Sequence, residues 1–516
     1  MTGYQALALA RCVLTLVLAA LFLVLAAGWL SPRRLRVLAL SMLAIGLLAY
    51  PNFGVLHLNQ YRHVHYWDAF HYFMGAKYLP ELGYGRLYEA TVVAGREMGA
   101  FRHVFQIRDL ASYEMRATRT IDADAIRRPF TPARWSAFKR DLTFFGAHIK
   151  EWPGPLLDHG YNDPPPRARL LHAMLRWVPA TPLTLRLLIA LDYLLMAAAL
   201  AAVWRAFGEI PAALAFTFLS LSFFARFDYI GGSILRWDWI AMLLIGVAAF
   251  ARGSGRVAGL CFGYAALARL FPLLFLVPLA VKWLQGRWRG QPDATLTRCL
   301  ATATALMLAV GAVLTLAGEP FSSLSDYVIK IGVHQQNPAV NAVGLGSLII
   351  FNSAPWTVNL DGTVSVSQYA AFAARPAAWV TPLAAALYLL VALPLIARSR
   401  ALASMMYAVP LIFFALSPTG YYYSFLMLLV LLPWEHGQVS RISLLQMALL
   451  SILMAISYVF EFASPDVLPL FNVAAIQTGL FFLMWLAFEY ARLGLAGAPM
   501  ISVASTLTPP AEPAAG

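Results

Sequence analysis

The chain has 516 residues, of which 60% are hydrophobic and only 12% charged. Soluble domains carry about 25% charged residues, so this composition excludes an ordinary soluble protein. The formal net charge of +13 does not indicate nucleic acid as a partner, because many basic residues lie in short loops between apolar segments, as in the cytoplasmic loops of membrane proteins. We therefore expect a multi-pass integral membrane protein whose partners include membrane lipids.

Residues 1–55 contain two apolar segments, near 8–30 and 37–55, which reach or approach the ~20 residues needed to cross a bilayer. Three arginines, at positions 33, 34 and 36, separate them. The positive-inside rule places this turn in the cytoplasm, so the next segment is expected outside. Residues 56–182 form this long external loop and its approach to the next helix.

Residues 183–317 continue the membrane region, with apolar helices expected near 183–206, 211–225, 237–252 and 298–317. Between the last two, 257–284 has basic residues at both ends, which places both ends on the same side of the membrane. Its length allows only two short helices, broken near Arg269 and Pro272.

A second external loop, 318–378, contains a segment, Tyr327–His334, with the pattern of an interfacial amphipathic helix. Residues 379–496 hold the C-terminal transmembrane helices, and the proline-containing tail, 497–516, is expected to be disordered. The chain thus predicts an all-α polytopic membrane helix bundle of about 11 to 13 transmembrane helices, with two long external loops carrying interfacial helices. We expect it in the cell (inner or plasma) membrane, with an active site on the external face.

Asp68 stands in a polar stretch that follows the N-terminal helices directly. A carboxylate at a membrane boundary is costly unless it is solvated, paired or used in chemistry. Asp68 is therefore interpreted as a general base that takes a proton from an acceptor hydroxyl, and the alternative is a solvated acid that caps or pairs locally. The same stretch supplies further site candidates: His65, His71, Tyr72 and Lys77.

Histidine and aspartate are also ligands of divalent metal ions, and His63, His65, Asp68 and His71 lie close in sequence. Their spacing matches no established metal-site pattern. We therefore expect no metal site and no cofactor, and keep a divalent ion as the alternative.

Two later turns contain further charged candidates. Asp163 precedes three prolines that stiffen the entry to the next helix, and it is either structural or a second site acid. Asp228 and Arg236 flank the Gly231-Gly232 pair. These two side chains either pair locally or line a polar cleft in which Arg236 is available to a phosphate.

Arg269 lies in the middle of an apolar run. An arginine at membrane depth usually faces a cavity or a partner, so we interpret it as a ligand for a lipid phosphate, with snorkelling to the interface as the alternative. Lys330 and His334, one helical turn apart, are a second phosphate candidate. Tyr422 belongs to an aromatic turn that either stacks on a sugar or simply lies at the membrane interface.

Several short motifs follow one another along roughly residues 60–430: Asp68 with Tyr72, Gly75, Gly83, Gly85, Leu87 and Tyr88; Tyr161 to Pro165; Ala258, Gly259, Gly263, Ala265 and Pro272; and Ser417-Pro418 with Tyr421 to Tyr423. Their order resembles that of polytopic glycosyltransferases of the GT-C class, and is most similar to family-87-type, polyprenyl-phosphate-dependent mannosyltransferases. Arg269 stands where lysine is usual in that family, and the turn Gly231–Asp238 replaces its usual Gly-Gln-x-Asn.

The resemblance implies an inverting membrane glycosyltransferase. Its donor would be a polyprenyl phosphate carrying mannose or a related hexose or pentose, and its acceptor a glycolipid or glycan at the external face. Asp68 would be the base, and Arg269, with Arg236 or Lys330, would stabilise the departing phosphate. The alternatives are a transporter or flippase of lipid-linked sugars, a polysaccharide ligase or polymerase, and a non-catalytic assembly protein. The sequence shows no internal repeat of the kind common in transporters.

Overall fold

The computed structural model describes residues 2–58, 63–150, 152–316, 321–353, 357–358, 364–365, 368–464, 466–494 and 500–502. Helices dominate these residues. The described strands form three short antiparallel pairs: β1 (Gln106–Arg108) with β2 (Met115–Ala117), β3 (Thr357–Val358) with β4 (Val364–Ser365), and β5 (Gln438–Ser440) with β6 (Met500–Ser502). The expected all-α class is therefore confirmed.

Six of the described helices are long and apolar enough to cross a membrane: α1 (Gly3–Ala26), α9 (Pro182–Phe207), α15 (Ala294–Leu316), most of α18 (Gln368–Arg398), α22 (Arg441–Ala463) and α23 (Val467–Gly494). Shorter helices of the bundle are α2 (Pro32–Ala49), α10 (Glu209–Leu221), α12 (Asp238–Ala251), α13 (Gly255–Ala268), α14 (Leu276–Trp288), α19 (Ala401–Ser404), α20 (Ala408–Ala415) and α21 (Leu428–Leu431). These helices bear out a membrane-embedded bundle, while the total of 11 to 13 spans stays a prediction.

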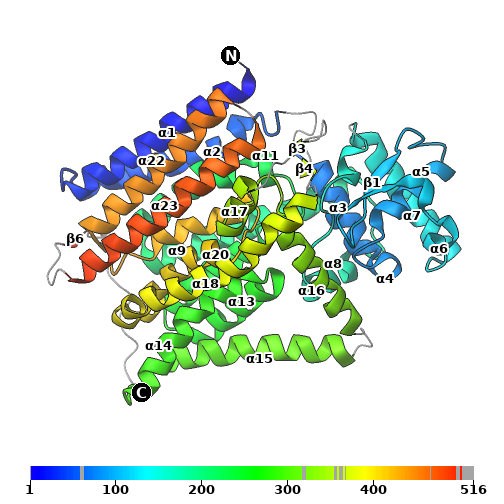
Figure 1. Cartoon of the computed structure of the whole chain (residues 1–516). Coiled ribbons are helices and arrows are strands. Elements are labelled where there is room, and N and C mark those ends of the chain that lie inside the picture. The colour runs from blue at the N-terminus through cyan, green and yellow to red at the C-terminus, as the bar shows by residue number, and fades with distance from the viewer. Residues whose placement is uncertain are drawn as a thin grey trace.

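The bundle is built by side-by-side helix pairs around one large apolar core. α1 packs along α22, α2 packs on α10, and α12 lies between α9 and α13 (Figure 1). Small residues let α13 approach α15 closely: a Cβ on Gly255 would lie 2.2 Å from the Thr295 carbonyl oxygen, and one on Gly259 would lie 2.3 Å from that of Cys299. Small residues four apart are a common way to pack membrane helices without a polar seam.

The segment predicted to be the first external loop forms a separate helical layer, the external layer, with its own apolar core. It contains α3 (Tyr66–Lys77), α4 (Leu79–Leu82), α5 (Leu87–Glu97), α6 (Ala123–Arg127), α7 (Pro132–His148) and α8 (Pro165–Leu175), together with β1 and β2. Figure 1 shows this layer, in blue to cyan, at one end of the bundle, and the C-terminal end of α1 at the other. The basic turn after α1 is thus far from the external layer, as the sequence predicts.

The second loop contributes α16 (Phe321–Gln336) and α17 (Leu345–Ser353), and α16 returns from the end of α15 to pack on α8 (Figure 1). Short turns complete the described helices: η1 (Asn52–Gly54), η2 (Thr118–Thr120), η3 (Gly154–Leu156), η4 (Phe223–Ala225), α11 (Phe227–Ile230), η5 (Phe271–Phe275), η6 (Met405–Tyr407) and η7 (Gly420–Met427).

The break expected near Arg269 is present. α13 ends at Ala268, Arg269 has extended backbone angles, and Pro272 lies in the turn η5 that leads into α14. The tail differs from its expectation: residues 500–502, predicted to be disordered, pair as β6 with β5, because the backbone at 438–440 offers them a strand edge. Residues 497–499 and 503–516 of that tail lie outside the described residues.

Candidate functional site

A cleft of about 580 Å³ lies where the bundle, the external layer and α16 meet. Its lining includes eight of the predicted site residues: His65, Asp68, His71, Tyr72, Arg236, Arg269, His334 and Tyr422. Residues far apart in sequence are thereby brought into one site, since α3, the turn before α12, the end of α13, α16 and η7 all contribute to its walls.

Asp68 enters the cleft from the first turn of α3. His65 caps this helix, and its Nδ1 accepts a hydrogen bond from the Asp68 backbone N–H at 3.2 Å. Asp68 Oδ1 lies 3.4 Å from Arg236 Nη2, whereas Oδ2 has no hydrogen-bond partner among the described residues. The side chain is 18% exposed. One carboxylate oxygen is therefore paired with a cation, and the other is buried without a hydrogen-bond partner among the described residues.

Arg236 is fixed by its backbone and by aromatic rings. Asp192, in α9, accepts from the backbone N–H groups of Arg236 (2.6 Å) and Trp237 (3.1 Å). The guanidinium lies 4.1 Å from the ring centroid of Tyr72 and donates to the Tyr421 hydroxyl. Within the described part of the chain, its Nε and Nη1 atoms have no partner. A buried guanidinium with unused N–H groups is suited to an anionic ligand.

Arg269 is held by a buried ionic network. Its Nη1 donates to Asp163 and to the Ala268 carbonyl oxygen, at 2.9 Å for the latter. Asp163 is fully buried and also pairs with Arg167, whose Nε lies 2.9 Å from Asp238 Oδ2. Alternating charges satisfy one another here, as buried ions require. Nε and Nη2 of Arg269 have no partner among the described residues, so this arginine also keeps donors for a ligand.

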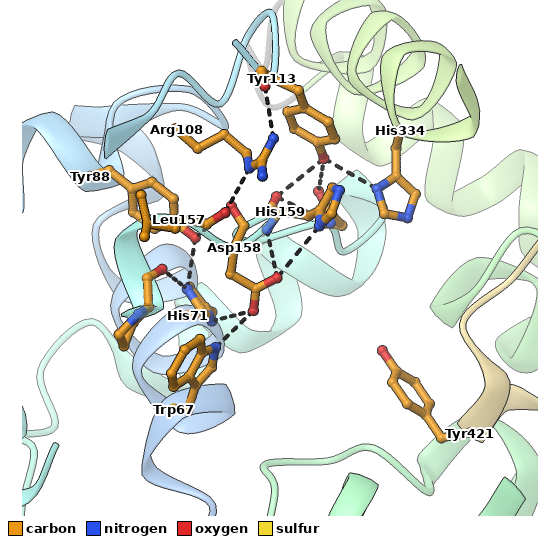
Figure 2. Close-up of polar contacts among 12 residues, drawn as sticks. Trp67, His71, Tyr88, Arg108, Tyr113, Leu157, Asp158, His159, His334 and Tyr421 are labelled. Carbon is orange, nitrogen blue, oxygen red and sulfur yellow. Dashed lines mark hydrogen bonds and ion pairs between the residues drawn. The ribbon is translucent and has the colours of Figure 1, made fainter. Parts of the chain in front are cut away.

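The opposite wall carries residues that the sequence interpretation did not single out (Figure 2). Asp158 Oδ2 accepts from the Trp67 indole N–H at 2.8 Å, and Oδ1 accepts from the His159 backbone N–H at 2.7 Å. His71 Nδ1 lies 4.0 Å from Asp158 Oδ2. Burial would raise the pKa of Asp158. The hydrogen bonds from His159 and Trp67, together with the nearby His71 and His159 rings, outweigh that effect and hold the pKa well below its usual range.

His334 completes this wall from α16. Its Nδ1 lies 3.3 Å from the Tyr113 hydroxyl, and its ring meets the His159 ring edge-on at 5.3 Å (Figure 2). Burial, followed by the neighbouring His159 and Lys330, lowers the pKa of His334 to about 3. The imidazole is therefore neutral at neutral pH, and offers one donor and one acceptor rather than a positive charge.

Lys77 and Asp228 are corrections to the predicted site, because both are used structurally elsewhere. Lys77 is buried, and its Nζ donates to Asp141 Oδ2 (2.6 Å) and to the Val178 carbonyl oxygen (2.7 Å). Asp228 accepts from Asn52 Nδ2 at 3.0 Å. Neither residue lines the cleft.

Asp163 and Lys330 also lie outside the cleft lining, although each is next to it. Asp163 anchors Arg269, as described above. Lys330 Nζ donates to the carbonyl oxygens of Tyr84 (2.9 Å) and Leu110 (3.4 Å), and faces a separate pocket of about 490 Å³. Burial lowers the pKa of Lys330 to about 7. Lys330 therefore lies outside the main site, and its expected role as a phosphate ligand stays a prediction.

Two of the missed residues had a usable signal and two did not. Asp192 is an acid in the middle of the apolar segment 183–206, which marks a functional or paired position. Arg167 follows Asp163 by one helical turn, a spacing at which opposite charges pair. Asp158 and His159 lie in an irregular loop with no periodicity, so their place in the cleft depends on tertiary contacts alone.

A smaller pocket of about 190 Å³ lies next to the cleft. The two share Gln335 and Leu416, and the smaller one is lined mainly by small or apolar side chains of α16, α17, α18 and α20, including Gly332, Gly346 and Ala378. One side of this pocket is formed by α18, whose side chains are mostly exposed along a segment apolar enough to cross a membrane.

Among the described residues, no group of three or more His, Cys, Asp or Glu side chains is arranged to hold a metal ion. The expectation that the protein uses no cofactor stays a prediction. Comparisons with protein-family models, with curated proteins and with solved structures found no match.

Proposed function

We propose that the protein is an integral membrane glycosyltransferase that transfers a sugar from a polyprenyl-phosphate donor to a hydroxyl group of a glycolipid or glycan acceptor at the external face. One observation carries the proposal: a carboxylate, Asp68, and two buried arginines, Arg236 and Arg269, keep unused polar atoms in one cleft. A base for the acceptor hydroxyl and cations for the donor phosphate are the two requirements of this transfer.

In the proposed reaction the acceptor oxygen attacks the anomeric carbon of the donor sugar while the bond from that carbon to the phosphate oxygen breaks. Asp68 takes the proton of the acceptor hydroxyl. Polyprenyl phosphate leaves with the bonding electrons, and Arg236 and Arg269 stabilise its charge. A direct displacement of this kind inverts the anomeric configuration.

The small apolar pocket beside the cleft supports a lipid-linked donor. Arg269 and Leu416 both line the cleft, and Leu416 also lines the small pocket against α18. The prenyl chain, which is apolar throughout, would pass through this pocket into the membrane.

The test is a transfer assay with the purified full chain in lipid vesicles. Radiolabelled polyprenyl-phosphate hexoses and pentoses are offered together with a glycolipid extract of the membranes that natively contain the protein. Labelled glycolipid and polyprenyl phosphate formed in equal amounts are the expected result. Movement of intact labelled donor across the vesicle membrane, with no bond broken, would instead establish a flippase.

A further inference from the structure

The two walls of the cleft differ in charge. Arg236 and Arg269 are the only arginine or lysine side chains among the described residues that line it, and both belong to the bundle. The facing wall comes from the external layer and α16, and presents polar side chains of another kind: Asp158, His159, Asn162 and His334. In Figure 2, Tyr421, which contacts Arg236, stands apart from this group.

Asp158 is held rigidly yet remains accessible. Both of its oxygens accept a hydrogen bond, from Trp67 and from the His159 backbone, and its side chain is still 41% exposed. A carboxylate oxygen has two lone pairs, so each oxygen can accept a second hydrogen bond from a ligand in the cleft. The fixed position means that little conformational freedom would be lost when the ligand binds.

The loop that carries Asp158 is itself braced. Arg108 donates to the carbonyl oxygens of Leu157 (2.7 Å) and Tyr113 (2.8 Å), and the Tyr113 hydroxyl donates to the His159 carbonyl oxygen at 3.2 Å (Figure 2). These bonds occupy the inner side of the loop. The outer side, with Asp158, faces the cleft.

This chemistry selects the class of ligand. A phosphate would be repelled by the Asp158 carboxylate, whereas hydroxyl groups donate to it. The Asn162 amide offers donors and an acceptor, and the His334 ring, whose Nδ1 contacts Tyr113, keeps its Nε2. The Trp67 ring, which also lines the cleft, offers an apolar face. A neutral ligand with many hydroxyl groups and exposed C–H faces fits all of these.

We infer that the wall formed by Trp67, Asp158, His159, Asn162 and His334 is a subsite for a sugar ring, with Asp158 as its principal hydroxyl acceptor. The inference rests on the proposed function in that it places the sugar across the cleft from the phosphate-binding arginines. Asp158 is not a second base, because its lowered pKa makes it a weak proton acceptor.

The ring in this subsite belongs either to the donor or to the acceptor, and one binding experiment distinguishes the two. Saturation-transfer NMR is measured on the purified full chain in lipid nanodiscs, with a panel of methyl hexosides and pentosides as probes. Displacement of the bound glycoside by polyprenyl-phosphate sugar, but not by sugar-free polyprenyl phosphate, assigns the subsite to the donor. Persistence of glycoside binding beside the bound donor assigns it to the acceptor.

The deciding variant is Asp158→Asn, which keeps the size of the side chain and removes its charge. Because hydrogen bonds to a charged group are strong, the dissociation constant of the Asp158→Asn variant for the glycoside should rise roughly ten-fold or more. Asp109→Asn is the matched control: Asp109 caps a turn of the same external layer, accepting from Ala111 N–H at 2.8 Å, and does not line the cleft. This control should bind glycoside like the wild type.

If Asp158→Asn does not fold, glycoside binding is measured for Asn162→Ala instead, because within the described part of the chain the Asn162 side chain makes only two hydrogen bonds, both long at 3.4 Å. Glycoside binding by either folded variant at wild-type strength, or no glycoside binding by the wild type, overturns the subsite. The readout needs no turnover. If the wild type binds glycoside but transfers no sugar, and the variant loses that binding, the subsite is retained and the proposed function is rejected.

Discussion

Arg236 Nη2 lies 3.4 Å from Asp68 Oδ1, and both side chains keep polar atoms that no other described residue binds. The pair joins the external layer to the bundle, since Asp68 begins α3 and Arg236 precedes α12. A purely structural ion pair would be expected to use most of its donors and acceptors, as Arg167 does with Asp163, Asp238 and the Leu235 carbonyl oxygen. The unpaired atoms of Asp68 and Arg236 are therefore the atoms expected to bind a ligand.

The first prediction concerns the planar form of Arg236. Lysine keeps the charge but loses both the stack on Tyr72 and the fork of N–H groups, so Arg236→Lys should lower sugar transfer roughly ten-fold or more. The measurement is radiolabelled transfer by the purified variant.

Arg11→Lys is the control for this prediction. Arg11 is another buried arginine, and it bonds the Ala49 carbonyl oxygen at 2.9 Å, but it does not line the cleft. Its lysine variant should transfer sugar within about two-fold of wild type, whatever it loses in stability. Wild-type turnover by Arg236→Lys would rule out a role for the guanidinium in the reaction.

The second prediction separates two arginines of one buried network. Arg167→Met leaves Asp238 without its guanidinium and should cost about 3–5 kcal/mol of stability, seen as poor expression or a lower melting temperature in detergent. Arg269→Met leaves Asp163 paired with Arg167, so it should fold better but bind sugar-free polyprenyl phosphate more weakly. Full affinity for that lipid in folded Arg269→Met would show that Arg269 is structural only.

Much of the architecture could be predicted because it depends on local pattern. The break at Arg269 follows from basic residues at both ends of a short apolar run and from Pro272, which limits helix continuation. Asp68 could be chosen because an acid directly after membrane helices stands out. These signals need no knowledge of what packs against them.

The rest of the site depends on partners distant in sequence. Its place in the polar stretch makes Lys77 a site candidate, yet its charge is satisfied by Asp141, on a different helix of the external layer. Asp158 is the opposite case: its loop has no periodicity that would mark it, and its role follows from its hydrogen bond with Trp67 and from the cleft it faces. Sequence pattern identifies charged residues at costly positions but not which of them remain unpaired.

The third prediction tests the small pocket beside the cleft as the exit of the prenyl chain. Ala378 lines the small pocket and is exposed, so Ala378→Trp should fill it without disturbing the core and should raise the KM for the polyprenyl-phosphate donor several-fold. Ala386→Trp, at an exposed position of the same helix outside the pocket, should not. Equal KM values for the two variants would show that the prenyl chain of the donor does not pass through this pocket.

The fourth prediction concerns sidedness. Ser112, in the external layer, and Arg287, near the end of α14, are both exposed, while the native cysteines Cys12, Cys261 and Cys299 are buried. Ser112→Cys should therefore react with a membrane-impermeant thiol reagent from outside intact cells, and Arg287→Cys should react only after the membrane is opened. The reverse pattern would invert the topology and move the cleft to the cytoplasmic face.

The central claim is that Asp68 is the base of a sugar transfer, and Asp68→Asn in the vesicle assay tests it most directly. Asparagine keeps the size of the side chain and a hydrogen-bond acceptor, but it cannot take a proton, so turnover should fall by about 10² or more. Binding of sugar-free polyprenyl phosphate should persist, which shows that the cleft is intact. Transfer by folded Asp68→Asn within a few-fold of wild type would contradict the account.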